Sequence, residues 1–158
     1  SEYRMPAEYA PHRGTLMIWP AAPQLGQGPS AAQAAFVRVF EAIAESEELY
    51  LLAGPEHLEA ARQAVAHIPR ARVLCIDTDA WARDVGPTFV KNEAGKLKGI
   101  SWSFNAWGGT VDGLYADWRK DDAVASAFCE AMHLPATMPL PLFWKAAAST
   151  PMGKAPRW

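Results

Sequence analysis

The sequence has few residues suited to metal or redox chemistry. Its 158 residues include two cysteines, Cys75 and Cys129, which are not at the spacing of a metal-ligand pair. Both lie in apolar runs, so we expect buried thiols with a raised pKa, the opposite of what a thiolate nucleophile needs. The sequence therefore predicts no metal site, no cofactor and no catalytic thiol.

The four histidines are also scattered along the chain, and none has a carboxylate at the spacing of a proton relay. We expect each of them to be a surface or capping residue. They are His12, His57, His67 and His133.

Clusters of one charge are missing as well. The net charge is −2, and Lys or Arg never form a run of more than two, which argues against nucleic acid or a membrane surface as a partner. The sequence shows no signal peptide and no long apolar span, so we expect a cytoplasmic protein. The charge pattern does not exclude a small cationic ligand, and the seven tryptophans offer aromatic faces on which a flat or cationic group can stack.

Hydrophobic periodicity alternates between strand and helix along the chain. Short apolar runs closed by Pro, Gly or Asp predict strands over residues 15–20, 49–54 and 72–77. Helical stripes predict helices over residues 30–44, with Ser30 as N-cap, and over 55–69 and 119–132. Residues 86–104 read as two strands joined by a turn at Asn92 and Gly95, and a further strand is expected after Pro135. The class predicted is α/β.

The stretch "DTDAWARDVGPTF", residues 77–89, places four ionised side chains where a strand meets its loop. A carboxylate after an arginine in a loop is most often a structural ion pair or a turn acceptor. Alternatively, Trp81 stacks on a planar cation while Asp84 accepts two parallel N–H bonds from it, as carboxylates do from guanidinium groups. In either case we expect Arg83 to point away and to pair with another acidic residue.

A second tryptophan lies beside a glycine pair in "SFNAWGGT", residues 103–110. The two glycines permit positive φ angles or a close backbone approach, so the segment is predicted to be a loop. Trp107 is either an anchor of this loop or part of a pocket wall. Its residue type alone leaves both interpretations open.

Three ordered motifs, "MPAEYAPHRGTLMIWP", "DAWARDVGPTFV" and "WSFNAWGG", resemble the agmatine deiminase family, which includes bacterial proteins similar to peptidylarginine deiminases. They span residues 5–109. The resemblance implies the pentein fold, an α/β-propeller of five ββαβ modules around a pseudo-fivefold axis. This chain would supply about the first two modules.

The resemblance also implies hydrolysis of a guanidinium group. A cysteine thiolate would attack the central carbon and a histidine would carry protons, so that agmatine becomes N-carbamoylputrescine and ammonia in polyamine biosynthesis. Asp84 matches the family carboxylate that holds the guanidinium, Trp81 matches an aromatic residue of the pocket, and Trp107 matches the tryptophan of the Asn-Ala-Trp-Gly-Gly loop. The family's Glu-Gly-Gly glutamate, His-x-Asp pair and C-terminal cysteine match no position here. We therefore expect the chain to be inactive alone.

Two other interpretations compete with a truncated deiminase. One is a non-catalytic module that binds guanidinium compounds or polyamines. The other, ranked last, is a doubly wound α/β domain, because no glycine-rich phosphate loop follows a predicted strand. If the pentein interpretation holds, an apolar flank is exposed where further modules should pack, so the chain is expected to form homo-oligomers or to aggregate.

The final stretch, "FWKAAASTPMGKAPRW", follows neither helical nor strand periodicity. Back-translated with permitted codons and read two bases later, it becomes Leu-Glu-Gly-Gly-Ser-Ile-His-Thr-Asp-Gly-Glu-Gly-Thr-Ala-Val, which contains the family's Glu-Gly-Gly segment. We therefore expect residues 1–142 to be deiminase-like and residues 143–158 to be a frameshifted, poorly packed tail without functional side chains. Lys145 would stand where the family has its glutamate.

Overall fold

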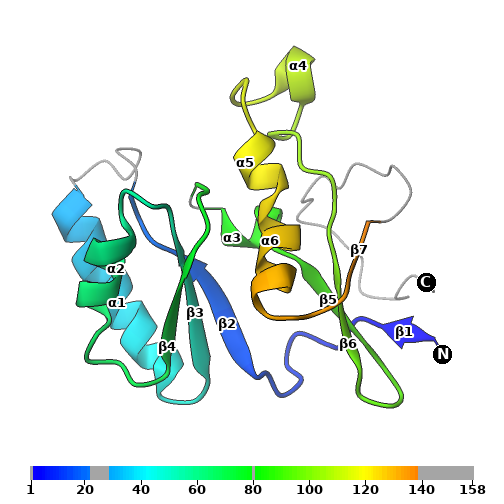
Figure 1. Cartoon of the computed structure of the whole chain (residues 1–158), viewed down its shortest axis with the longest axis horizontal. Helices are drawn as coiled ribbons and strands as arrows, with labels where there is room; N and C mark the ends of the chain where they lie inside the picture. Colours follow the sequence, from blue (N-terminus) through cyan, green and yellow to red (C-terminus); the bar gives the residue numbers. More distant parts are fainter. Residues whose placement is uncertain (1, 22–28, 80, 139–158) are drawn as a thin grey trace. The chain divides into compact units, whose positions relative to one another are not determined.

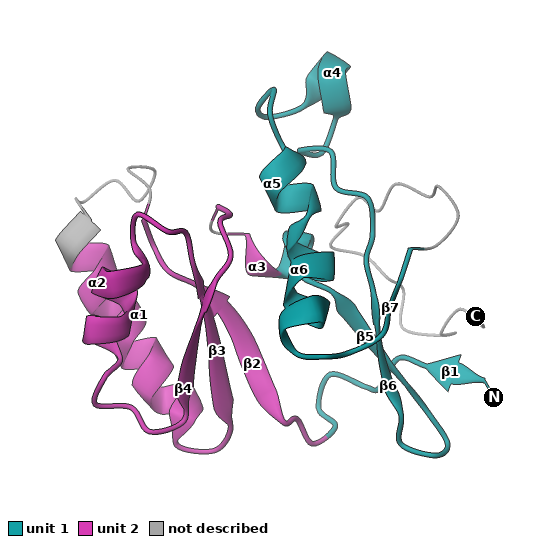
Figure 2. Ribbon diagram, in the orientation of Figure 1, with its two compact units in different colours: residues 1–10, 83–158 teal, residues 11–82 magenta. Residues whose placement is uncertain are grey.

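The computed structural model describes residues 2–21, 29–79 and 81–138, which fall into two compact units (Figures 1 and 2). Unit 1 takes residues 1–10 and 83–158, and unit 2 takes residues 11–82. Each unit has its own β-sheet. The proposed tail, residues 143–158, lies outside the described residues.

Unit 2 alternates strands and helices, as the sequence predicts. Strands β2 (Gly14–Ile18), β3 (Glu48–Ala53) and β4 (Ala71–Cys75) are all parallel and lie in the order β2-β3-β4. Helix α1 (Pro29–Ala44) connects β2 to β3, and α2 (Leu58–Ala64) connects β3 to β4. Helix α1 begins one residue before the predicted N-cap Ser30, and α2 is shorter than predicted.

Both helices pack on the same face of this sheet. The strand order advances in one direction, and right-handed crossovers in one direction place every helix on one side. A doubly wound sheet needs helices on both faces, and the described residues of unit 2 place helices on one face only. The shared core contains Trp19, Phe40, Leu49, Leu51, Ala53, Ala61, Val65 and Ile68.

Unit 1 contains a four-stranded mixed sheet. Its strands are β1 (Tyr3–Arg4), β5 (Thr88–Asn92), β6 (Leu97–Ile100) and β7 (Ala136–Thr137), in the order β1-β5-β6-β7. Strands β5 and β6 are antiparallel, and β7 returns parallel to β6 after helix α6 (Val124–Ala131). Unit 1 therefore contains the β-β-α-β order expected of a module, whereas unit 2 has the order β-α-β-α-β.

The predicted turn between β5 and β6 is present. Gly95 has a φ of +78°, and its N–H donates to the carbonyl of Asn92 at 2.9 Å. The Asn92 side-chain oxygen accepts from the N–H of Lys96 at 2.9 Å. A short polar side chain and a left-handed glycine together reverse the chain here.

Three short helices depart from the sequence prediction. The helix expected over residues 119–132 is divided into α5 (Arg119–Asp122) and α6, with Ala123 between them. Helices α3 (Ala82–Val85) and α4 (Gly109–Asp112) form within segments expected to be loops. A single helical turn contains too few residues to show a hydrophobic period, so these elements leave no recognisable pattern.

Helix α6 ends in a Schellman motif that uses a histidine. His133 has a φ of 53°, its N–H donates to the carbonyl of Glu130, and the N–H of Leu134 donates to that of Cys129 at 2.8 Å. These two bonds satisfy carbonyls that the helix leaves without a partner. The expected capping role of His133 is confirmed.

Close packing of α6 on β6 leads to a testable prediction. A methyl group added at Gly99 would lie 2.3 Å from Sγ of Cys129 but 3.9 Å from its Cβ. We expect Gly99→Ala to lower the free energy of unfolding by about 1–3 kcal/mol, because the two groups overlap. Adding Cys129→Ala removes the sulfur, so urea unfolding of the double variant should show recovery of stability. An additive loss would contradict this packing.

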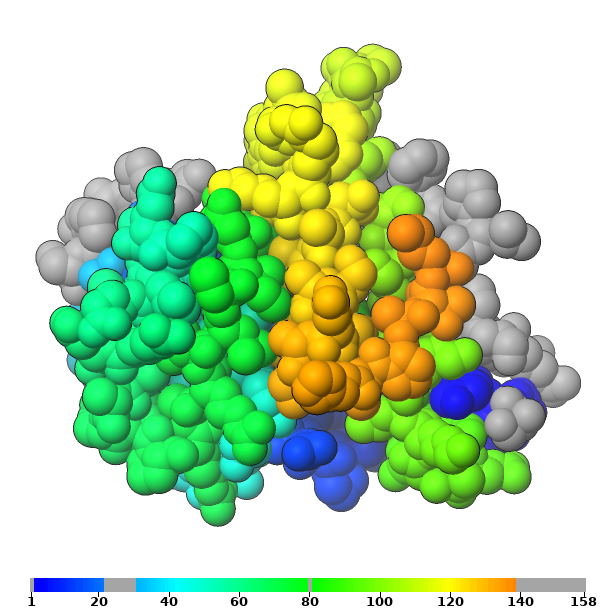
Figure 3. Space-filling view, viewed as in Figure 1, coloured from blue at the N-terminus to red at the C-terminus, as the bar shows by residue number. Residues whose placement is uncertain are grey.

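The loop that carries α4 projects from the rest of unit 1 (Figures 1 and 3). Its side chains Val111 and Leu114 are 86% and 70% exposed. Within the described ranges, no helix is both long and apolar enough to cross a bilayer.

Candidate functional site

Asp84 lies in α3, a single helical turn, and its side chain is half-buried. The following residue, Val85, is buried and anchors this turn in the core. The preceding residue, Arg83, is turned to solvent, where its guanidinium pairs with the Glu8 carboxylate at 2.5 Å. The expectation that Arg83 pairs with a different acidic residue is confirmed.

The Asp84 carboxylate has no hydrogen-bond or ion-pair partner among residues 2–21, 29–79 and 81–138. The structural interpretation of an aspartate in this motif needs such a partner, either an arginine or a turn N–H. Because Glu8 engages Arg83, the adjacent cation does not neutralise Asp84. A half-buried carboxylate of this kind is suited to accept a cationic ligand.

Trp81 is 49% exposed, which is high for a tryptophan. Its backbone N–H donates to the carbonyl of Asp79 at 3.0 Å, which closes a tight turn just before α3. Trp81 belongs to unit 2, whereas Asp84 belongs to unit 1. A shared role for the two residues in one ligand site stays a prediction from their motif.

Trp107 lies in a loop with an unusual backbone. Ala106, Trp107 and Gly109 have φ angles of 53°, 65° and 63°, all in the left-handed region. Two of these residues carry a Cβ, so their conformation is strained and must be supported by surrounding contacts. The prediction that the glycine pair provides positive φ or close approach is confirmed, because a methyl group at Gly108 would lie 2.3 Å from the Asp112 backbone.

The Trp107 ring lies between two other aromatic rings. Its centroid is 5.1 Å from that of Phe104 and 6.5 Å from that of Tyr115, and both pairs are edge-to-face. The Tyr115 hydroxyl donates in turn to the carboxylate of Asp121, which is buried. Sequence reasoning missed Tyr115 and Asp121, since neither belongs to a recognisable motif.

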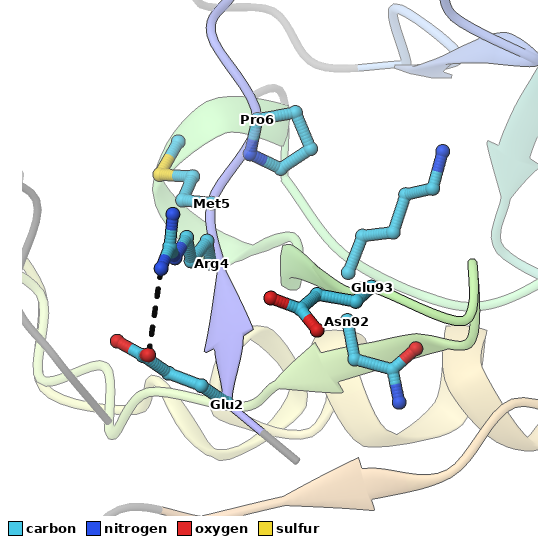
Figure 4. A pocket seen from close by; sticks show the side chains of 7 residues that line it. Glu2, Arg4, Met5, Pro6, Asn92 and Glu93 are labelled. Carbon is cyan, nitrogen blue, oxygen red and sulfur yellow. Dashed lines mark hydrogen bonds and ion pairs between the residues drawn. The ribbon is translucent and has the colours of Figure 1, made fainter.

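A shallow depression of about 240 Å³ lies beside β1 and β5 in unit 1 (Figure 4). Two of the lining residues, Arg4 and Glu2, form an ion pair with 3.5 Å between Nη2 and Oε2. The depression contains none of the predicted site residues. Its mixed charges and exposed side chains indicate an ordinary surface feature at the sheet edge.

The two cysteines differ in burial. Cys129 is buried, and burial raises the pKa of its thiol, as predicted. The prediction for Cys75 is wrong, because this cysteine is exposed. It is the last residue of β4, which lies at the edge of the sheet, so an apolar neighbourhood in sequence does not cover it.

Alkylation should separate the two thiols. We expect iodoacetamide at pH 8 to modify Cys75 much faster than Cys129. The reagent reacts with the thiolate, and it can reach the exposed Cys75 but not the buried Cys129. Peptide mass spectrometry at timed intervals measures both rates. The Cys75→Ser variant, which retains only Cys129, should stay largely unmodified over the same period; rapid labelling of that variant would contradict the burial of Cys129.

The β-β-α-β unit and the Trp-Ala-Arg-Asp motif fit the pentein class of α/β proteins. A sequence profile of the family described as Porphyromonas-type peptidyl-arginine deiminase matches residues 4–144. The chain belongs to this family.

Several relatives have a function in their names. The agmatine deiminase of Stutzerimonas stutzeri (strain A1501) is 50% identical over 130 residues, which cover 81% of this chain and 35% of that protein. The solved agmatine deiminase of Enterococcus faecalis is 37% identical, with a TM-score of 0.80 over 87% of this chain and 38% of that one. The agmatine deiminase of C. jejuni, at 16% identity and a TM-score of 0.70, shows the fold alone.

The chain thus spans a little over a third of the length of these relatives. This share agrees with the prediction of about two pentein modules out of five. The pentein fold predicted from the sequence is confirmed.

Proposed function

We propose that this chain is the part of an agmatine deiminase that binds the guanidinium group through Asp84. The observation that carries this proposal is the half-buried Asp84 carboxylate, which no described residue neutralises. A guanidinium presents parallel N–H donors that match the two oxygens of a carboxylate. Membership of the deiminase family supports the same assignment.

The aromatic residues have a complementary role in the proposal. The exposed indole of Trp81 offers a planar face on which a guanidinium can stack. Trp107 would contribute a second aromatic surface from its constrained loop. Neither cysteine of this chain is proposed as the nucleophile: Cys129 is buried, and Cys75 lies at a strand end without a described histidine partner.

Agmatine is our proposed substrate, with N-carbamoylputrescine and ammonia as products in polyamine biosynthesis. The relatives at 50% and 37% identity are named agmatine deiminases, which favours agmatine over a peptidyl arginine. A cytoplasmic location and homo-oligomerisation are also proposed, from the sequence alone. Sedimentation tests the second: a sharply monomeric chain would contradict it.

The second candidate is a non-catalytic module that binds guanidinium compounds. It is favoured by one observation: the printed 158 residues contain no Glu-Gly-Gly or His-x-Asp motif. Such a module needs the carboxylate and the aromatic faces, but no nucleophile. Binding and catalysis therefore have to be measured separately.

Calorimetric titration of the chain with agmatine tests the role of Asp84. If the site binds alone, we expect agmatine to bind and Asp84→Asn to weaken it by about tenfold or more, since a charge-assisted bond contributes about 1.5–3 kcal/mol. Putrescine, which has an amine in place of the guanidinium, should bind more weakly than agmatine. Glu130→Gln removes the same charge from an exposed position of α6 and should change nothing.

The possible results separate the two candidates. Agmatine binding without release of ammonia supports the non-catalytic module. Absence of agmatine binding excludes that module and leaves the interpretation that this chain is part of a deiminase. Agmatine binding that Asp84→Asn does not weaken would contradict the proposed role of Asp84 in both.

A further inference from the structure

We infer that Tyr115 and Asp121 are positioning residues that hold the Trp107 indole in its orientation at the ligand site. The inference deepens the proposed function, because it rests on Trp107 being part of the guanidinium-binding surface. It concerns unit 1 alone, in which all the residues involved lie.

Trp107 belongs to a loop that is closed at its base. The N–H of Leu114 donates to the carbonyl of Ala106 at 2.9 Å, so this hydrogen bond joins the two ends of the loop, residues 106–114. The carbonyl of Asn105, the residue just before the loop, accepts from the N–H of Gly109 at 2.7 Å. Trp107 follows directly after one side of this base, and Tyr115 directly follows the other.

The outer part of the loop offers little support. Val111 is 86% exposed, so its side chain buries little apolar surface. The strained φ angles of Ala106 and Trp107 cost of order 1–3 kcal/mol each and persist only where surrounding contacts enforce them. The contacts that can enforce them lie at the loop base.

Two neighbouring acidic residues of α5 hold the two sides of this base. The Asp122 carboxylate accepts from the backbone N–H of Phe104 at 2.6 Å, just before the loop. The Asp121 carboxylate accepts from the hydroxyl of Tyr115, just after it. The Trp107 ring then lies edge-on against both Phe104 and Tyr115.

The N-terminal end of helix α5 is held by hydrogen bonds between Arg119 and Asp117. The Asp117 carboxylate accepts from the backbone N–H of Arg119 at 3.2 Å and from its guanidinium at 2.8 and 2.9 Å. The Arg119 hydrogen bonds hold the pKa of Asp117 well below its usual value. The first turn of α5 therefore presents Asp121 and Asp122 from a defined position.

A purely structural role explains Asp121 poorly. Its side chain is 1% exposed, and an apolar residue of similar volume fills a buried position without the cost of removing a charge from water. The carboxylate has a specific consequence instead: it fixes the hydroxyl of Tyr115, and thereby the ring that contacts Trp107. Orientation of Trp107 is the property that this arrangement determines.

Fluorine NMR of the full chain labelled with 5-fluorotryptophan tests the inference without requiring activity. The sequence has seven tryptophans, and Trp107→Phe identifies the Trp107 resonance by its loss. We expect Tyr115→Phe, which removes only the hydroxyl, to shift and broaden this resonance and to leave those of Trp19 and Trp81 in place. Tyr9→Phe is the matched control, since Tyr9 is 93% exposed.

Two substitutions at Asp121 separate hydrogen bonding from charge. Asp121→Asn retains an oxygen that accepts from Tyr115, so the Trp107 resonance should stay near its original position. Asp121→Ala removes the acceptor and should reproduce the effect of Tyr115→Phe. If Tyr115→Phe unfolds the chain, the two Asp121 variants by themselves test the inference. Equal positions of the Trp107 resonance in Asp121→Asn and Asp121→Ala would overturn it.

Agmatine titration of the same variants connects orientation with binding. We expect Tyr115→Phe and Asp121→Ala to weaken binding by about three- to tenfold, the effect of one hydrogen bond, and Asp121→Asn to restore it. An unmoved Trp107 resonance in Tyr115→Phe overturns the positioning role. If the resonance moves as expected while the unsubstituted chain binds no agmatine, the proposed binding by this chain fails and the positioning of Trp107 stands.

Discussion

Insertion of one base directly after the Leu142 codon is expected to produce an active deiminase from a chain that we expect to be inactive alone. The insertion replaces residues 143–158 with a sequence that contains Leu-Glu-Gly-Gly, as the back-translation indicates. The profile of the family matches residues 4–144, and the change of frame near Leu142 stays a prediction from the sequence. Ammonia release from agmatine measures the gain.

The expected gain has a physical reason. In the printed sequence Lys145 stands where the restored frame has a glutamate, so a cation replaces an anion where a cationic substrate should bind. The restored frame must also encode the His-x-Asp pair and the cysteine that performs the attack. Inserting three bases at the same place keeps the printed frame and serves as the control. A gene without an open downstream frame would contradict the proposal.

Leu51→Ala is expected to cause the largest loss of stability among the substitutions considered. Leu51 lies in the central strand β3, is completely buried, and belongs to the core formed with α1 and α2. Truncating such a leucine removes apolar contacts and leaves a cavity, which costs about 2–5 kcal/mol. This is a large fraction of the stability of a typical domain.

Leu114→Ala provides the matched control, because it is the same substitution at a side chain that is 70% exposed. It should change the free energy of unfolding by less than about 0.5 kcal/mol. Urea unfolding followed by circular dichroism measures both variants. Equal losses for Leu51 and Leu114 would contradict the assignment of the unit 2 core.

The elements that could be predicted from the sequence are the longer ones. Strand β3 is an unbroken apolar run that is buried from Leu49 to Ala53, and helix α1 carries apolar residues at helical spacing, so both patterns are visible in the sequence. Strand β7 lies where a strand was expected after Pro135, but strand β1 and the one-turn helices were not predicted, because tertiary contacts form them and their own residues show no period. Division of the predicted helix at Ala123 belongs to the same class.

The candidate site was only partly accessible from the sequence. The Trp-Ala-Arg-Asp motif identified Trp81 and Asp84, and residue type suggested that Arg83 would pair elsewhere. Its partner, Glu8, lies 75 positions away in the chain, so no local pattern identifies it. Tyr115 and Asp121 were missed for a similar reason, since Tyr115 contacts the Trp107 ring and Asp121 accepts the hydrogen bond of the Tyr115 hydroxyl, and neither contact leaves a local pattern.

By itself, the sequence determined the α/β class and the family, because periodicity and motif spacing are properties of neighbouring positions, and it predicted Trp81, Asp84 and Trp107 as the residues that hold a guanidinium. Only the tertiary structure decided which groups are covered and which are paired. It exposed Cys75 at a sheet edge, engaged Arg83 with Glu8, and left Asp84 without a partner among the described residues. Burial and pairing depend on segments distant in the chain that folding brings together, so a local pattern cannot specify them.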